Sequence, residues 1–221
     1  MITCSPKGDN FFKKMHIAIA GNMGSGKSTL TNLLAKHYGW EARFEAVDHN
    51  PYIADYYKDI HRWSFNLEVY FLKERFRDLL YISQAEHTIV QDRTIYEGVY
   101  VFVQNNRDMG HLTERDFTTY MELFDNMMEM VRVPDLMVYL RCSVAHLVSN
   151  IQKRGRDYEQ QISLDYLQNL NRRYDEFIFN KYKGKVITIE KDNLDFLANP
   201  KDFSMIVDKI DRTLFGLFPD E

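Results

Sequence analysis

The chain has 221 residues, of which 45% are hydrophobic and 27% are charged, and its formal net charge is −4. This composition is typical of a globular protein with its own core, and the mild negative charge argues against nucleic acid as the main partner. A mean hydropathy of −0.43 and the absence of a long apolar run predict neither a membrane span nor a secretory signal. The two cysteines, Cys4 and Cys142, suit a reduced, cytoplasmic protein better than a disulfide scaffold.

Strand and helix patterns alternate along the chain after a polar start. We expect a flexible extension over residues 1–14 and a single domain over residues 15–221. Buried strands are predicted at 16–20, 42–44, 88–91, 136–140 and 186–189. Helices are predicted at 27–38, 63–83, 95–103, 114–131, 144–153 and 164–182, with a loop at 45–51 and a last helix after Pro200. This alternation favours a parallel sheet covered by helices on both faces.

The segment between the first strand and the first helix matches the phosphate-binding motif G-x-x-x-x-G-K-[ST]. Its residues are Gly21, Asn22, Met23, Gly24, Ser25, Gly26, Lys27 and Ser28. Glycines let backbone N–H groups turn toward phosphate oxygens, and the helix N-terminus adds partial positive charge. Lys27 is predicted to bind the β- and γ-phosphates, and the Ser28 hydroxyl to ligate Mg²⁺. We therefore expect ATP or another NTP bound on a P-loop NTPase-like, three-layer α/β fold, with about five parallel strands flanked by helices.

GTPases, motors and small-molecule kinases share this motif, so a second feature must decide between them. A guanine-specifying N-K-x-D segment is missing, because residues 180–183 read Asn-Lys-Tyr-Lys. A basic segment at about 153–160 contains Arg154 and Arg156. Arginines stabilise the charge that spreads over a transferring phosphoryl group. This segment predicts a lid over the phosphates and favours a small-molecule kinase.

Charged residues follow the second and third predicted strands. Glu45 comes after the second strand, and Asp92 and Arg93 end the third. Ligands of open α/β sheets bind at the carboxyl ends of strands, so these groups should face one crevice with the phosphate loop. Glu45 would take a proton from an acceptor hydroxyl, Asp92 would hold Mg²⁺ directly or through water, and Arg93 would clamp phosphate or orient Glu45.

Taken together, these segments resemble the deoxynucleoside kinases, in particular the bacterial deoxyadenosine/deoxyguanosine kinase branch. The likeness covers nearly all of residues 15–217. The segments that carry it are Gly21 to Thr29, Phe44-Glu45, Trp63-Ser64-Phe65-Asn66-Leu67, Gln91-Asp92-Arg93-Thr94-Ile95-Tyr96-Glu97 and Lys153-Arg154-Gly155-Arg156-Asp157-Tyr158-Glu159. Such enzymes transfer the γ-phosphate of a nucleoside triphosphate to the 5′-hydroxyl of a deoxynucleoside, in nucleotide salvage.

The resemblance implies a role for each part of the site. Glu45 matches the general base, Arg93 the arginine beside it, and Asp92 the acidic group of the metal region. Arg154 and Arg156 match lid arginines. Tyr57 and Glu159 match the pair that holds the sugar 3′-hydroxyl, and the nucleoside would lie between the Trp63 to Arg75 helix and Gly98. The family is usually homodimeric, and the methionine-rich face of residues 114–131 is a candidate for the dimer surface, with ordinary core burial as the alternative.

Two departures from the family pattern bear on the base. Glu68 stands where the family commonly has Gln, and Gly98 stands where many relatives have Asp. An ionised carboxylate only accepts hydrogen bonds, and guanine offers it two adjacent donors, N1–H and the 2-amino group. Glu68 therefore predicts a preference for deoxyguanosine over deoxyadenosine, weakened if Arg75 pairs with Glu68.

Two other functions remain open at this point. A monophosphate kinase of the thymidylate kinase type would bind an acceptor phosphate, which the Glu45 carboxylate would repel. A nucleotide-binding regulator without transfer chemistry would leave the lid, Glu45 and Asp92-Arg93 unexplained.

Overall fold

A five-stranded parallel sheet forms the centre of the protein. The computed structural model describes residues 14–45, 50–156 and 162–216, so the expected extension lies almost wholly outside it. The strands are β1 His16–Ala20, β2 Glu41–Arg43, β3 Ile89–Asp92, β4 Leu136–Arg141 and β5 Val186–Glu190. Their order is β2-β3-β1-β4-β5, and every neighbouring pair is parallel. The predicted fold class is confirmed.

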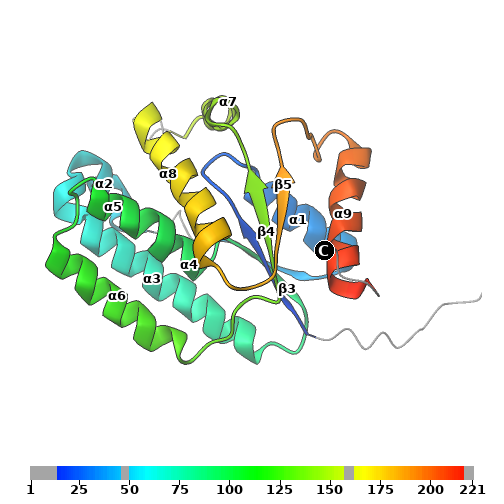
Figure 1. Ribbon diagram of the computed structural model, residues 1–221, viewed down its shortest axis with the longest axis horizontal. Coiled ribbons are helices and arrows are strands. Elements are labelled where there is room, and N and C mark those ends of the chain that lie inside the picture. The colour runs from blue at the N-terminus through cyan, green and yellow to red at the C-terminus, as the bar shows by residue number, and fades with distance from the viewer. Residues whose placement is uncertain (1–13, 46–49, 157–161, 217–221) are drawn as a thin grey trace, which may run out of the picture.

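Alternate residues of the central strands face two separate cores, as a sheet covered on both sides requires. Ala18 and Ala20 of β1 belong to one core, and Ile17 and Ile19 belong to the other. The first core packs under α3 Ile60–Gln84, α6 Glu114–Met128 and α8 Leu164–Glu176, and the second under α1 Lys27–Tyr38 and α9 Pro200–Phe215. Figure 1 shows these two groups of helices on opposite sides of the sheet.

Most helix ends carry the local signals that define them. The helix α1 has its predicted bounds, and it ends because Gly39, at φ 72°, donates its N–H to Ala35. Ser143 caps α7 Val144–Arg154, and Ser163 caps α8, each accepting a backbone N–H. Asn199 caps α9, with Pro200 in its first turn.

Three segments differ from the predicted elements. The predicted loop at 45–51 is followed by an unpredicted helix, α2 Ile53–Lys58. The predicted helix 95–103 is α4 Ile95–Glu97 followed by the π-helical η1 Gly98–Val103, and it runs on into α5 Gln104–Asp108. The helix α8 likewise ends in a π-helical turn, η3 Phe177–Lys181. Both π-helical segments lie against the first core.

The methionine-rich face of α6 was a candidate dimer surface, with ordinary core burial as the alternative, and its part in a dimer stays a prediction. Tyr120 and Phe124 are buried in the first core, and the other apolar residues of this face pack against the same core. Those residues are Phe117, Met121, Met127, Met128 and Val131. This face contacts the chain's own α3 and η1, as the alternative of core burial predicts.

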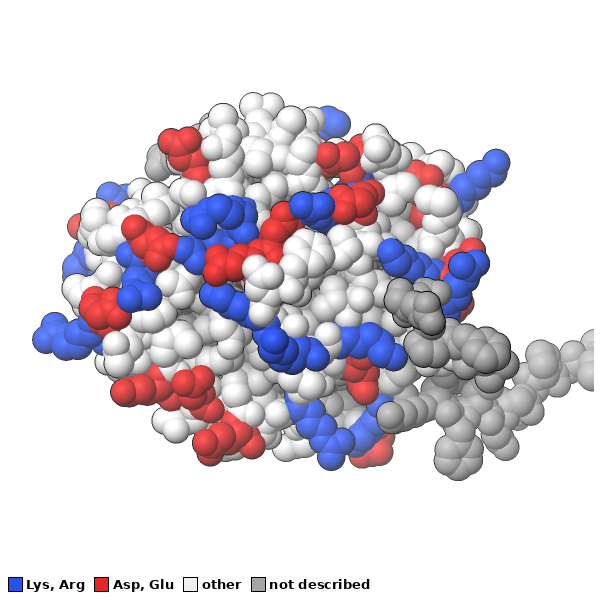
Figure 2. All heavy atoms as spheres, in the orientation of Figure 1, with Lys and Arg blue, Asp and Glu red and all other residues white. Residues whose placement is uncertain are grey.

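The surface shows charges of both signs. On the face seen in Figure 2, basic and acidic side chains are intermingled outside the residues drawn in grey. Within the described ranges, no helix is both long enough and apolar enough to cross a membrane.

Candidate active site

The phosphate loop is a tight turn between β1 and α1. Gly24 and Gly26 have φ values of 81° and 94°, which side chains rarely adopt. A Cβ on Gly24 would also lie 2.9 Å from the Leu147 carbonyl oxygen of α7. The Asn22 amide ties the loop to α8 through Leu167 O at 3.2 Å and Asn171 Oδ1 at 2.9 Å. The conformation of the loop is therefore fixed by contacts with α7 on one side and α8 on the other.

Lys27 is buried at the end of this loop. Its ammonium donates to Asn22 O at 3.0 Å. Burial, helped by the nearby Arg93 guanidinium, lowers the pKa of Lys27 to about 8. An anionic ligand would give this ammonium a negatively charged partner.

Ser28 and Asp92 meet where a magnesium ion would bind. The Ser28 hydroxyl donates to Asp92 Oδ2. Asp92 Oδ1 is buried, and the described residues give it no hydrogen-bond partner. A hydroxyl oxygen and a carboxylate oxygen are hard ligands of the kind that Mg²⁺ prefers, so the residues present fit the ion.

Glu45 lies between two guanidinium groups. Arg75 Nη2 is 2.5 Å from Glu45 Oε1, and Arg93 Nε is 3.0 Å from Oε2. Burial acts to raise the pKa of Glu45, but the charges of Arg93 and Arg75 outweigh it and lower the pKa to about 2. Glu45 is thus ionised at neutral pH and fixed at both oxygens.

Arg93 holds an uncommon backbone conformation. Its φ of 68° is the only positive value among the described non-glycine residues. Such a conformation costs about 1–3 kcal/mol and persists where surrounding contacts enforce it. Its N–H donates to Ile19 O at 3.0 Å, and its guanidinium lies 4.6 Å from the centre of the Phe102 ring. The turn directs the side chain back toward Glu45.

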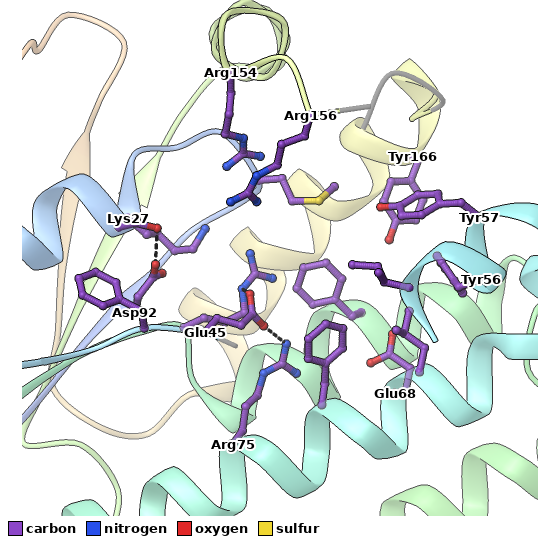
Figure 3. A pocket seen from close by; sticks show the side chains of 18 residues that line it. Lys27, Glu45, Tyr56, Tyr57, Glu68, Arg75, Asp92, Arg154, Arg156 and Tyr166 are labelled. Atoms are coloured by element: carbon purple, nitrogen blue, oxygen red, sulfur yellow. Dashed lines mark hydrogen bonds and ion pairs between the residues drawn. The ribbon is translucent and has the colours of Figure 1, made fainter. Parts of the chain in front are cut away.

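A cavity of 310 Å³ joins these charged groups to an aromatic slot. Figure 3 shows Lys27, Asp92 and Glu45 toward one end and Tyr56, Tyr57, Tyr166 and Glu68 toward the other. Arg154, the last residue of α7, and Arg156, just after it, point into the cavity from above. Apolar and aromatic side chains complete the lining: Met23, Phe44, Ile53, Leu67, Phe71 and Phe102. The cavity therefore offers a polar end for phosphate and a flat, apolar end for a ring.

Glu68 lies at the far end and is 4% exposed. The predicted possibility of a Glu68–Arg75 pair is not what the structure shows, because the carboxylate that contacts Arg75 is that of Glu45. Glu68 Oε1 instead accepts a hydrogen bond of 2.9 Å from the Asn106 amide. Glu68 thus borders the slot, and among the described residues it forms no direct ion pair.

Two predicted substrate residues do not line this cavity. Trp63 packs against Tyr52, with ring centroids 5.9 Å apart, and lies beneath the Arg62 guanidinium. Gly98 lies behind Arg75, where a Cβ would come within 2.4 Å of Nη1. Tyr57 does line the cavity, while its predicted companion Glu159 is outside the described residues.

A second hollow of 890 Å³ adjoins the phosphate loop on the other side. It is bordered by Gly24, Gly26, Lys27, Ser28 and Thr29, by α7 with Arg154, and by Arg156 and residues 191–197. Lys191 and Phe196 lie under Gly26, since a Cβ there would be 3.2 Å from the Phe196 ring and 3.8 Å from Lys191 Cε. Arg154 and Arg156 border both hollows, as a lid over a transferring phosphate would.

Sequence reasoning missed several residues of the site. The segment after β5 lies at the carboxyl end of a strand, as Glu45 does. The same rule that predicted Glu45 could therefore have predicted this segment. Tyr56, Phe71 and Tyr166 had no signal, because aromatic residues on helices are more often core. Asn106 also had none, since its role depends on a contact with Glu68 from a different helix.

A phosphate loop at the head of this sheet, facing a cavity with a clamped carboxylate, defines a P-loop kinase. A family model described as "Deoxynucleoside kinase" matches residues 17–215, and the chain belongs to that family. It is therefore a deoxynucleoside kinase, a nucleotide-binding phosphotransferase of deoxynucleoside salvage. The resemblance predicted from the motifs is confirmed, and membership decides against a monophosphate kinase or a regulator.

Relatives differ in the base they act on. The chain is 38% identical over 200 residues to the deoxyadenosine/deoxycytidine kinase of Bacillus subtilis, covering 90% of this chain and 92% of that one. It is 37% identical over 217 residues to the deoxyguanosine kinase of Lactobacillus johnsonii, covering 93% and 96%. The structure of the deoxyadenosine kinase from M. mycoides with products dCMP and dCDP bound superposes with a TM-score of 0.79 at 33% identity, covering 89% and 99%. The family alone thus leaves the base undecided.

Proposed function

We propose that this kinase transfers the γ-phosphate of ATP to the 5′-hydroxyl of a purine deoxynucleoside, with deoxyguanosine favoured over deoxyadenosine. The observation that carries the proposal is the Glu45 carboxylate, which lies between the phosphate loop and a slot that ends at Glu68. A hydroxyl acceptor needs such a carboxylate beside it, whereas an acceptor phosphate would be repelled by it.

The donor triphosphate lies on Gly21 to Thr29, with its base in the hollow beside residues 191–197. Lys27 binds the β- and γ-phosphates, and Arg154 and Arg156 stabilise charge on the moving phosphoryl group. Ser28 and Asp92 would hold Mg²⁺, and the unpartnered Asp92 Oδ1 supports this ligand set. When bound, the ion would supply positive charge that offsets the negative charge of the phosphates.

At the acceptor, Glu45 and Arg93 place the 5′-oxygen in line with the γ-phosphorus. The bond from the 5′-oxygen to phosphorus forms, the bond from phosphorus to the β–γ bridging oxygen breaks, and the hydroxyl proton passes to Glu45. A carboxylate with a pKa of about 2 is a weak base. The transition state of phosphoryl transfer is loose, so orientation of the hydroxyl matters more than early removal of its proton.

Glu45→Gln tests this role. The amide keeps the shape of the side chain but cannot accept a proton, and we expect kcat to fall by at least about a hundredfold. Nucleoside binding, measured by calorimetry without ATP, should change little. The matched control is Glu41→Gln, a carboxylate on the preceding strand that pairs at the surface with His87. Normal turnover by Glu45→Gln would refute the base role, and loss of folding would make the carboxylate structural.

Base choice is assigned to Glu68 and Arg75. The ionised Glu68 carboxylate would accept N1–H and the 2-amino group of guanine. Arg75 Nη1 is buried, has no hydrogen-bond partner among the described residues and is a donor suited to guanine O6. Because Arg75 contacts Glu45 and not Glu68, the Glu68 carboxylate remains available to the base.

Glu68→Gln tests the base assignment. Gln offers one donor and one acceptor, so the ratio of deoxyguanosine to deoxyadenosine turnover should fall by about tenfold or more, the worth of one hydrogen bond to a charged group. Steady-state kinetics on the four natural deoxynucleosides give the ratio, with deoxyguanosine monophosphate and thymidine monophosphate as control acceptors. An unchanged ratio would remove Glu68 from base recognition.

Sugar recognition and assembly complete the proposal. Tyr57, together with Glu159, would hold the 3′-hydroxyl in a pocket with little room for a 2′-hydroxyl.

We also propose a homodimer, by resemblance to the family, with the methionine-rich face of α6 as its candidate surface. Light scattering on the purified protein would report one mass of 26.3 kDa or twice that mass.

A further inference from the structure

Glu68 is held by a network that reaches it from other elements. Its Oε1 accepts from Asn106 Nδ2 at 2.9 Å, and Asn106 is fully buried in α5. The Asn106 carbonyl oxygen Oδ1 accepts from Tyr56 of α2 at 3.3 Å and lies 3.4 Å from His111 Nδ1. Because the Tyr56 hydroxyl donates to Oδ1, the NH₂ group of Asn106 faces Glu68.

Charged and titratable groups surround Glu68 on several sides. They are Arg75 on its own helix, Glu45 after β2, Arg93 after β3, Tyr56 on α2, Tyr120 on α6 and Tyr166 on α8. Burial raises the pKa of Glu68 to about 7, although the charge of Arg75 opposes the shift. The tyrosines stay neutral, because burial raises the pKa of each of them.

We infer that Asn106 is a positioning residue which makes Glu68 a two-state reader of the base: ionised Glu68 selects deoxyguanosine, and protonated Glu68 selects deoxyadenosine and deoxycytidine. This inference rests on the function proposed above and adds the control of its specificity. It is carried by the fixed orientation of the Asn106 amide and by the burial of the Glu68 carboxyl at the end of the slot.

The donor pattern of Glu68 follows from where its proton can sit. Oε1 faces an N–H of Asn106 and must keep a lone pair toward it, so a proton is placed on Oε2. Ionised, both oxygens accept, which matches the N1–H and 2-amino donors of guanine. Protonated, Oε1 accepts while Oε2–H donates, which matches the amino group and the unprotonated ring nitrogen of adenine or cytosine. Without Asn106 the proton would be shared between the two oxygens, and neither orientation would be fixed.

The wild-type enzyme provides the first test. If each base binds one protonation state, the ratio of kcat/KM for deoxyguanosine to that for deoxyadenosine is proportional to the ionised fraction of Glu68 divided by its protonated fraction. This ratio should rise about tenfold per pH unit between about pH 6 and about pH 8, whatever the pKa of Glu68. Effects of pH on ATP, Lys27 or Glu45 act on both substrates and cancel in the ratio.

Two variants separate the parts of the inference. Glu68→Gln should abolish the pH dependence of the ratio. Asn106→Asp replaces the donor with an acceptor that disfavours ionised Glu68, so the ratio should fall at least about tenfold at every pH. The matched control is Asn105→Asp, the same change at a neighbouring buried position whose amide contacts Met109, and it should leave the ratio unchanged.

The outcomes are distinct from a failure of the proposed function. A ratio that is flat with pH in the wild type overturns the inference, even if deoxyguanosine remains the better substrate. Equal losses on both substrates in Asn106→Asp would make Asn106 merely structural and overturn it as well. Absence of turnover on all four deoxynucleosides would instead refute the proposed function.

Discussion

Lys27 shows how one residue combines a folding cost with a function. Its ammonium is buried near Arg93, so its pKa is depressed to about 8 before any ligand binds. A bound triphosphate reverses this effect by bringing several negative charges to the same place. The charged form of Lys27 is thus disfavoured in the free enzyme and favoured when the donor triphosphate is bound.

Replacing Lys27 with Ala should lower kcat/KM by at least about a hundredfold, because a charge that stabilises the transferring phosphoryl group is removed. The loss should be equal for deoxyguanosine and deoxyadenosine, since Lys27 contacts the donor and not the acceptor base. Steady-state kinetics on both nucleosides measure it, with Lys36→Ala on the exposed face of the same helix as the control. A loss confined to one nucleoside would contradict the assignment.

The charged residues of the site were predictable because they follow strands in the sequence. Glu45, Asp92 and Arg93 were placed together from the rule that ligands bind at strand carboxyl ends, and the structure does bring them to one cavity. The partner of Arg75 was not predictable, because helical spacing gives the side on which a residue lies and not the charge it meets. Trp63 shares its helix with Glu68, yet its ring turns toward Tyr52 and away from the slot.

At the scale of elements, the π-helical η1 matters because its first residue makes room for Arg75. Gly98 has helical backbone angles, so the side chain it lacks matters more than conformational freedom. A Cβ would approach Arg75 Nη1 to 2.4 Å, so the guanidinium that contacts Glu45 would have to move.

Gly98→Ala should therefore lower kcat/KM by roughly tenfold to a hundredfold, the cost of misplacing a reacting group by about an ångström. The free energy of unfolding should change by less than about 1 kcal/mol, because Ala suits this backbone and the end of the Arg75 side chain can move. Kinetics and urea denaturation on the same preparation give both numbers. Full activity in a stable variant would show that Arg75 does not need its present position.

Strands were the most predictable elements. The four strands β1, β3, β4 and β5 were placed to within a residue at each end, because short segments rich in Ile, Val and Leu are typical of strands with at least one buried face. The π-helical segments were missed because one extra residue per turn leaves the local apolar spacing nearly helical. The helix α2 was missed because its six residues are too few to show a helical period of apolar positions.

At the scale of the whole molecule, stability depends on a histidine in the central sheet. His16 is 7% exposed, and its Nε2 lies 2.9 Å from Gln91 Oε1. Burial lowers the pKa of His16 from 6.5 to about 4. The unfolded chain therefore takes up a proton below about pH 6.5 that the folded protein refuses until about pH 4, so stability falls as the pH falls through this window.

Between about pH 7 and about pH 5 the loss from His16 should be about 2 kcal/mol, since the free energy changes by 1.36 kcal/mol for each pH unit below the unfolded pKa. His16→Gln can donate to Gln91 without titrating, so this part of the loss should disappear. Guanidinium denaturation of both proteins at the two pH values measures the difference. An identical pH dependence in the variant would place the acid sensitivity elsewhere in the chain.

The parallel order of the sheet has a consequence for how activity appears during folding. The phosphate loop, Glu45, Asp92-Arg93 and the segment after β5 reach one edge only when strands from both ends of the chain are paired. Parallel neighbours require long crossovers, so these contacts are non-local and form slowly. No early hairpin or isolated helix pair can carry partial function. After dilution from denaturant, phosphoryl transfer should return together with the last strand pairing and never ahead of it, which makes catalysis itself a reporter of complete folding.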